Sequence, residues 1–205
     1  SVLKKIAMPI FRSYNKDSWI PSKQTYWSGL SSGKQMMPTA HAALMAINRG
    51  IVSKNKMPLV QKYLFKHSAD RANNHSRGGI IPELFFDLDL SVEGIDSPYT
   101  AFGMLEEFYK NNRDTEALEF IREKWNHMMK DTLTGTLTEA FGGGDLCHNN
   151  GAIPAYFLSS KVLGVSEKLP VNSKIIEIKP MLGNLTRAEG TVVTVHGPVH
   201  VKWLK

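Results

Sequence analysis

The sequence is poor in cysteine and has no long apolar run. Its one cysteine, Cys147, rules out an internal disulfide framework and supplies too few thiolates for a structural zinc site. The longest uninterrupted apolar runs, residues 42–47 and 152–158, fall far short of the roughly 20 residues that cross a bilayer. We therefore expect neither a disulfide-stapled scaffold nor a membrane partner.

The sequence also lacks a concentrated block of charge. It has 25 Lys and Arg against 19 Asp and Glu, a formal net charge of +6, yet the basic residues are scattered, with short clusters only near residues 4–5 and 54–56. Nucleic-acid binders more often gather basic side chains on one stripe with aromatic residues for stacking. We expect no nucleic-acid partner. The 42% hydrophobic and 21% charged content is that of an ordinary globular protein.

Acidic and histidine residues lack the grouping of a metal site. Asp87 and Asp89 lie two residues apart, but a hard cation such as calcium wants more oxygen ligands than two carboxylates provide. We favour exposed ends and caps over calcium ligands for Asp87, Asp89, Glu93 and Asp96. His67 and His75 lie too far apart, in loop-like sequence, to indicate a metal site. No metal or other cofactor is expected.

Helical start and stop signals predict about five helices in hairpin order between residues 34 and 164. The first has Pro38 and Thr39 at its start and Gly50 just past its end, and the second begins at Pro58. A second hairpin begins at Ser97, with Asp114 expected to cap its second helix, and a last helix runs from about Ala152 to Val162 and ends at Gly164. The residues expected on the buried faces of the second hairpin are Tyr99, Phe102, Leu105, Phe108, Leu118, Ile121, Trp125 and Met128 or Met129.

The two ends of the chain differ from this helical middle. Residues 1–33 mix prolines, serines and aromatics without a period, so we expect an irregular segment with one short helix. Its aromatic residues, among them Trp27, have two competing roles, core packing and stacking on the apolar face of a sugar. After Gly164 apolar and polar residues alternate, which predicts strands and a hairpin with its turn at Gly197 and Pro198.

One loop concentrates groups that can do chemistry. Glu139 precedes three consecutive glycines at 142–144, and Asp145, Cys147 and His148 follow them. Because glycine loses the most backbone freedom on ordering, such a run marks a loop that bends sharply or approaches something closely. A carboxylate before the bend and an imidazole after it can then converge on one small volume, although each residue taken singly is more often a cap or a solvated side chain. Direct neighbours usually point apart, so we expect Cys147 to pack as a small apolar side chain rather than to pair with His148.

The order of motifs around this loop resembles the α-L-rhamnosidase family of glycoside hydrolases. The resemblance lies in TLTEAF at residues 136–141, LCHNNGAIPAYFL at 146–158 and the sequence from 175 to 203. It covers residues 97–205 well and 34–67 more loosely. The resemblance implies a mainly α fold, in which residues 1–165 are the C-terminal part of an (α/α)6 barrel and residues 166–205 begin an antiparallel β-domain. It also implies that the N-terminal half of the barrel lies outside this sequence.

The same resemblance implies site residues and a reaction. Glu139 matches the general base of an inverting glycosidase, and His148 matches a substrate contact. Asp145, Trp27 and Asp96 are further candidate sugar contacts. The general acid has no counterpart here, so the chain alone should be inactive or nearly so. Expected substrates are terminal α-L-rhamnosides or glycosides of a similar deoxy sugar, and the alternative is a non-catalytic carbohydrate-binding or scaffold protein of the same fold.

Overall fold

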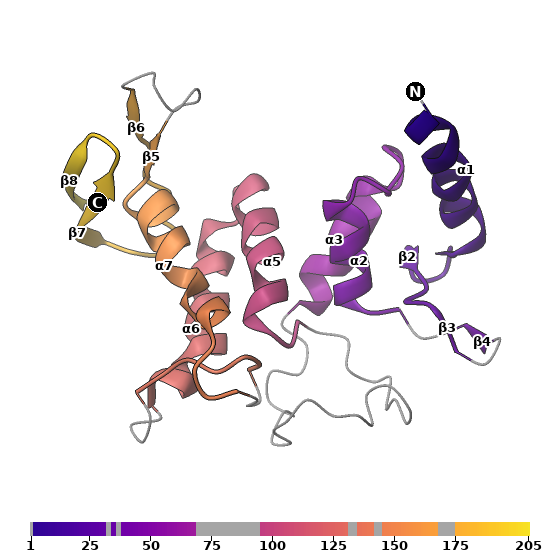
Figure 1. The fold of residues 1–205 in the computed structure, drawn as a ribbon, viewed down its shortest axis with the longest axis horizontal. Coiled ribbons are helices and arrows are strands. Elements are labelled where there is room, and N and C mark those ends of the chain that lie inside the picture. The colour runs from indigo at the N-terminus through magenta and orange to yellow at the C-terminus, as the bar shows by residue number, and fades with distance from the viewer. Residues whose placement is uncertain are drawn as a thin grey trace. The chain divides into compact units, whose positions relative to one another are not determined.

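The computed structural model describes residues 2–31, 34–35, 38–68, 95–130, 135–141, 145–167 and 175–205. They fall into two compact units, Ser1–Asp96 and Ser97–Lys205. Helices dominate the chain, and short antiparallel strand pairs accompany them (Figure 1). The predicted class, mainly α with a short antiparallel β segment, is therefore confirmed. The predicted boundary between residues 165 and 166 stays a prediction.

The first unit opens with a longer helix than the sequence predicted. α1 spans Val2–Asp17 and contains Pro9 in its interior. Proline removes one backbone hydrogen bond there, yet the helix continues on both sides of it. The expectation of an irregular segment with one short helix was wrong for residues 2–17, because it rested on mixed composition and the lack of a period.

Two short strand pairs follow α1. β1 (Trp19–Ile20) pairs with β2 (Thr25–Tyr26), and β3 (Leu30–Ser31) pairs with β4 (Lys34–Gln35), both in antiparallel register. The first pair brings a fully buried ring, that of Tyr26, into the core of the unit.

Tyr26 belongs to a network that joins three parts of the first unit. Its hydroxyl donates to Asn15 Oδ1 at 2.7 Å, and Asn15 Nδ2 donates to the Ile51 carbonyl at 2.7 Å. Its ring also lies 4.7 Å from that of Tyr14 and 5.2 Å, edge-on, from that of Trp19, measured between ring centroids. These contacts give Trp19 and Tyr26 a packing role, one of the two roles that the sequence left open.

The first helical hairpin is confirmed. α2 spans Ala40–Asn48 and α3 spans Met57–His67. Thr39 caps α2, because its side-chain oxygen accepts from the Ala42 N–H at 3.1 Å. The apolar residues buried between the two helices include Leu44, Ile47, Val60 and Leu64.

The second unit contains the predicted second hairpin, but one helix face differs. α5 spans Pro98–Lys110 and α6 spans Asp114–Lys130. Tyr99 and Phe102, expected to be buried, are 65% and 36% exposed. Steps of three residues drift around a helix of 3.6 residues per turn, so a run at that spacing cannot stay on one face. The buried residues of α5 include Ala101, Met104, Leu105 and Phe108.

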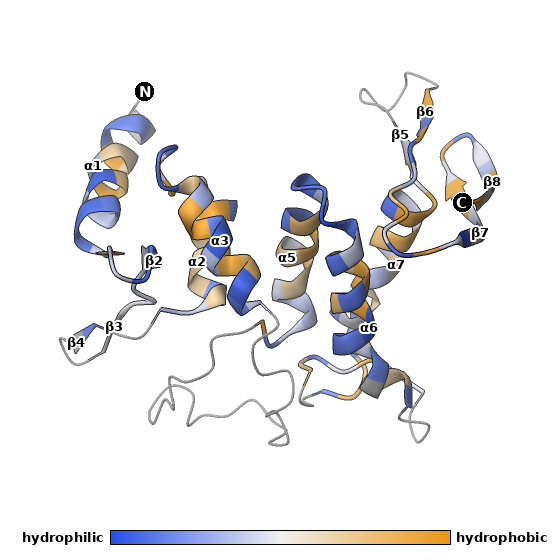
Figure 2. Cartoon of the chain, turned by 180° about the vertical axis from the view of Figure 1, so that it is seen from behind, coloured by the Kyte–Doolittle hydropathy of each residue, from blue (hydrophilic) through white to orange (hydrophobic). Residues whose placement is uncertain are grey.

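The expected buried stripe of α6 is only partly right. Leu118 and Trp125 are buried as predicted, and of the two methionines left open Met128 is buried and Met129 is 72% exposed. Ile121 is only half-buried. The helix shows a hydrophilic and a hydrophobic side in Figure 2. Asp114 was expected to cap this helix and is instead its first residue, where its carboxylate accepts from the Gly183 N–H at 2.5 Å.

The last helical segment has three parts. A 3-10 turn (η2, Asn149–Ala152) leads into α7 (Ile153–Phe157), and a π turn (η3, Leu158–Val162) ends it. The chain then leaves the helix at Gly164, as the sequence predicted, with a φ of +76°.

Paired strands close the second unit. β5 (Val165–Glu167) pairs with β6 (Ile176–Ile178), and β7 (Arg187–Thr194) pairs with β8 (Gly197–Leu204). The turn of the second pair is Val195–His196, because Gly197 pairs with Thr194 and Pro198 with Val193. The predicted turn at Gly197 and Pro198 was therefore two residues too late. None of the helices in the described part of the chain is long and apolar enough to cross a membrane.

Two buried tyrosines should make the protein sensitive to alkali. Burial raises the pKa of Tyr26 to about 12, with a smaller contribution from Tyr14, and burial with the Asp114 charge raises the pKa of Tyr109 to about 12. The unfolded chain releases these protons near the ordinary value of 10.0, and the folded chain keeps them to higher pH. We expect the free energy of unfolding to be at its full value below pH 10 and to fall as the pH rises toward 12.

Tyr109→Phe provides the matched test. The Tyr109 hydroxyl is buried and has no hydrogen-bond partner among the described residues. The substitution should leave the unfolding free energy at neutral pH unchanged or slightly higher. It should also reduce the fall in unfolding free energy as the pH rises above 10. Urea denaturation at neutral pH and through the alkaline range measures both. If the unfolding free energy of Tyr109→Phe falls with rising pH as much as that of the unsubstituted protein, Tyr109 does not contribute to the sensitivity to alkali.

Candidate functional site

The loop between α6 and η2 folds back on itself as a hairpin. The Glu139 N–H donates to the Asp145 carbonyl at 3.1 Å, and the His148 N–H donates to the Leu137 carbonyl at 2.9 Å. Thr136 Oγ1 also donates to the Leu146 carbonyl. Residues 135–141 therefore run beside residues 145–148, and the glycine run at 142–144 lies outside the described residues. The arrangement brings the segment of Glu139 next to the segment of His148, and the convergence of the two side chains on one small volume stays a prediction.

Helix α6 anchors this loop hairpin through Trp125. The indole, only 4% exposed, donates from Nε1 to the Gly151 carbonyl at 2.7 Å. Its ring meets the Phe141 ring edge-on, with 4.7 Å between centroids. On the other side Gly151 packs tightly, because a Cβ there would lie 2.3 Å from Leu137 Cβ. Both segments of the loop hairpin are thus fixed to the helical core.

Two buried polar atoms in the loop hairpin have unused hydrogen-bonding capacity. Glu139 Oε2 and His148 Nδ1 are both buried, and neither has a hydrogen-bond partner among the described residues. Buried polar atoms are nearly always paired in folded proteins, so these two atoms are candidates for contact with a water or a ligand. A carboxylate oxygen accepts a proton or hydrogen bond, and an imidazole nitrogen does either according to its tautomer. Glu139 forms no salt bridge within the described part of the chain.

The other residues of the loop lie on its outside. Asp145 is exposed, and its carbonyl rather than its carboxylate contacts the Glu139 segment. Cys147 is a free and exposed cysteine, so the expectation that it packs as a small apolar side chain was wrong. The cause is its place in a bend, between Leu146 and His148, where its side chain faces outward.

The remaining candidates lie away from the loop in sequence. Trp27 and Asp96 are half-buried and belong to the first unit. Their convergence with Glu139 stays a prediction. Asp87, Asp89 and His75 fall outside the described residues. Within the described residues, no group of three or more His, Cys, Asp or Glu side chains is placed to hold a metal ion.

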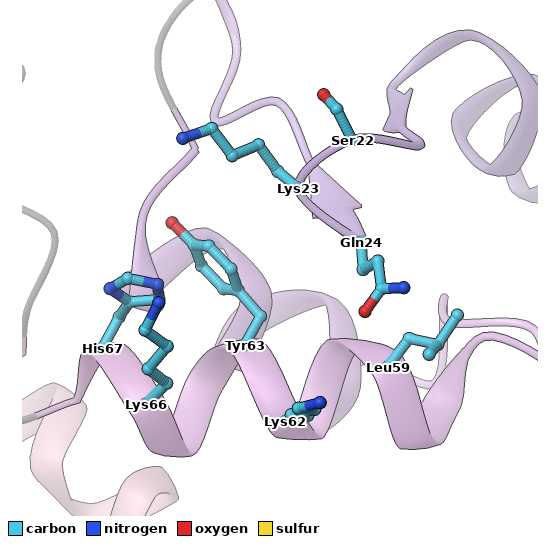
Figure 3. Close-up of a pocket in the computed structure, with 8 residues that line it drawn as sticks. All are labelled: Ser22, Lys23, Gln24, Leu59, Lys62, Tyr63, Lys66 and His67. Atoms are coloured by element: carbon cyan, nitrogen blue, oxygen red, sulfur yellow. The ribbon is translucent and has the colours of Figure 1, made fainter.

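A pocket in the first unit was not predicted from the sequence. It has a volume of about 360 Å³ and lies between the turn after β1 and one face of α3 (Figure 3). The signal that could have indicated it is the recurrence of lysine at Lys62 and Lys66, one helical turn apart on α3. The third lysine, Lys23, comes from a turn about forty residues earlier, which no local pattern connects to the helix.

Comparison with known proteins identifies the fold. No protein-family model matches the sequence, and no curated protein does. The crystal structure of a GH78 family rhamnosidase of Bacillus sp. GL1 is similar to this chain, with a TM-score of 0.73 and 22% sequence identity. The match covers 99% of this chain and 20% of that chain, so this chain spans about a fifth of the length of its structural relative. The predicted resemblance is confirmed at the level of the fold.

Proposed function

We propose that this chain is the C-terminal portion of a glycoside hydrolase that hydrolyses terminal α-L-rhamnosides, or glycosides of a similar deoxy sugar, with inversion. Residues 1–165 form part of an (α/α)6 barrel in this proposal, and residues 166–205 begin a β-domain. The fold shared with a GH78 rhamnosidase supports a glycosidase-like architecture. The observation that carries the proposal is the pair of unpartnered buried atoms, Glu139 Oε2 and His148 Nδ1, on one hairpin.

The role proposed for Glu139 comes from the family resemblance, and its buried, unpartnered carboxylate oxygen supports it. In inverting glycosidases one carboxylic acid protonates the leaving oxygen, and a second carboxylate, roughly 6.5 to 9.5 Å away, removes a proton from the attacking water. Glu139 takes the second role. Water donates a hydrogen bond to Oε2, its oxygen attacks the anomeric carbon, and its proton passes to the carboxylate. The hydrogen bond from the Glu139 N–H to the Asp145 carbonyl holds the backbone from which this carboxylate projects.

The other groups bind rather than react. His148 is proposed to hydrogen-bond a sugar hydroxyl through Nδ1, and the lack of a partner for this buried atom among the described residues supports that role. Asp145, Trp27 and Asp96 are proposed as further sugar contacts. The general acid is assigned to the part of the barrel that these 205 residues do not include.

Product stereochemistry tests the proposal. The intact enzyme is incubated with an aryl α-L-rhamnoside, and proton NMR follows the first sugar released. We expect the β-anomer to appear first and to mutarotate afterwards, because a single displacement inverts the anomeric centre. Aryl glucuronides and fucosides, assayed in parallel, define the preferred sugar. Release of the α-anomer would contradict the single displacement, and saturable rhamnose binding without turnover would favour the non-catalytic carbohydrate-binding alternative.

A further inference from the structure

The pocket in the first unit has a rigid wall made by a constrained turn. The backbone N–H groups of Lys23 and Gln24 both donate to the Ile20 carbonyl, at 3.2 and 2.9 Å. Gln24 has a φ of +57°, a left-handed conformation that a residue with a side chain adopts uncommonly. Such a conformation persists only where the surrounding structure holds it, and it often marks a binding site. The turn carries Ser22, Lys23 and Gln24 at the upper side of the pocket (Figure 3).

The floor of the pocket is one face of α3. Leu59, Lys62, Tyr63, Lys66 and His67 recur at the spacing that places residues on one side of a helix. Val60 and Leu64, on the neighbouring side of α3, are buried, and α3 packs against α2. The Tyr63 hydroxyl donates to the Pro38 carbonyl at 3.0 Å, and the Tyr63 ring centroid lies 4.4 Å from that of His67. These contacts hold the floor in place.

The pocket is strongly basic. Lys23, Lys62 and Lys66 are exposed at its rim, and His67 is half-buried. None of its described lining residues is acidic. Each lysine ammonium group is a compact positive charge with three hydrogen-bond donors. Positive charges that line the same pocket repel one another, and a bound anion relieves this repulsion.

We propose that this pocket binds the oxyanion of a small hydroxylated ligand, the carboxylate or phosphate group of a charged sugar. The lysines contact the anion, and the Gln24 amide, which points toward α3 in Figure 3, hydrogen-bonds the ligand's hydroxyl groups. A volume of about 360 Å³ suits a single sugar ring. This site goes beyond the proposed hydrolysis and does not depend on it.

Three sugars that share their hydroxyl groups and differ in charge test the proposal. Isothermal titration of the intact protein uses glucose, glucuronate and glucose 6-phosphate. We expect saturable binding of one or both anions, weakened by added salt because partly exposed charges are screened, and at least tenfold weaker binding of glucose. Preference for glucuronate identifies the carboxylate as the recognised group, and preference for glucose 6-phosphate identifies the phosphate. Equal binding of all three sugars, or of none, would overturn the proposal.

Matched lysine variants locate the site. Lys62→Gln combined with Lys66→Gln should weaken anion binding by about tenfold or more, since each change removes a charge-assisted contact. Lys54→Gln removes an exposed lysine from the turn between α2 and α3, outside the described lining of the pocket, and should leave binding unchanged. Lys23→Gln provides a second test from the opposite wall. Unchanged anion binding in both the double variant and Lys23→Gln would show that the pocket is not the site.

Discussion

Glu139→Gln in the intact enzyme should lower turnover of an aryl α-L-rhamnoside by about two orders of magnitude or more, with little change in melting temperature. Glutamine keeps the shape of glutamate but cannot take a proton from water, and general-base catalysis contributes roughly 10²- to 10⁴-fold. Oε2 has no hydrogen-bond partner among the described residues, so the substitution breaks no known contact of the fold. A loss in kcat without a loss of stability is the signature of a catalytic carboxylate. Steady-state kinetics and thermal unfolding on the same preparation measure the two effects.

Glu123→Gln is the matched control for this prediction. Glu123 lies exposed on α6 in the same unit, and the same change of one charge there should leave both kcat and melting temperature unaltered. Activity that survives Glu139→Gln would show that another group activates the water. A large drop in melting temperature in Glu139→Gln alone would instead assign the carboxylate a structural role.

Elements defined by local signals could be predicted from the sequence. The first hairpin is the clearest case, because Thr39 caps α2 through its own side chain and Pro58 suits the first turn of α3. The helix end at Gly164 was predicted for the same reason. In each case a residue type satisfies a backbone requirement within a few positions, so no distant contact is needed to place it.

Errors arose where distant contacts or helical geometry decide the outcome. Residues 99, 102, 105 and 108 repeat at three-residue steps and were assigned to one buried face. The true helical repeat of 3.6 residues leaves Tyr99 and Phe102 off that face, while Leu105 and Phe108 are buried. Residues 1–33 were expected to be irregular because they show no sustained period, yet residues 2–17 form α1, which continues through Pro9. Cys147 is exposed because hydrogen bonds to residues 137–139 fix the bend in which it lies. Those contacts cannot be predicted from the composition of the loop.

The candidate site was predictable in part. A carboxylate and an imidazole flanking a glycine run predicted adjacent segments, and the hydrogen bonds of Glu139 and His148 confirm that adjacency of the backbone. The role of each side chain stays a prediction, as does the contribution of Trp27. The basic pocket was missed because its lysines come from an early turn and a later helix, and only folding brings them together. Sequence patterns of short range therefore identify hairpins better than they identify pockets.

Gly164→Ala should destabilise the second unit by roughly 2–5 kcal/mol. The left-handed φ of +76° at this position costs an alanine about 1–2 kcal/mol. A Cβ at residue 164 would also lie 2.3 Å from the Lys179 carbonyl carbon and 2.3 Å from the Pro180 nitrogen. Backbone atoms cannot move aside as a flexible side chain can, so overpacking adds about 1–3 kcal/mol. Urea denaturation, with a check that the m-value is unchanged, measures the loss.

Gly135→Ala separates the two contributions to that loss. Gly135 lies in the same unit with a φ of +61°, but none of the described residues places an atom within 4 Å of its would-be Cβ. Gly135→Ala should therefore lose only the free energy that the left-handed φ costs an alanine, about 1–2 kcal/mol. The additional loss of unfolding free energy in Gly164→Ala then measures the cost of the steric clash with the backbone at Lys179. The Lys179 N–H donates to the Gly164 carbonyl at 2.9 Å, which fixes this close approach. Equal losses in the two variants would show that the backbone at Lys179 and Pro180, just after β6, moves aside to admit the extra methyl group.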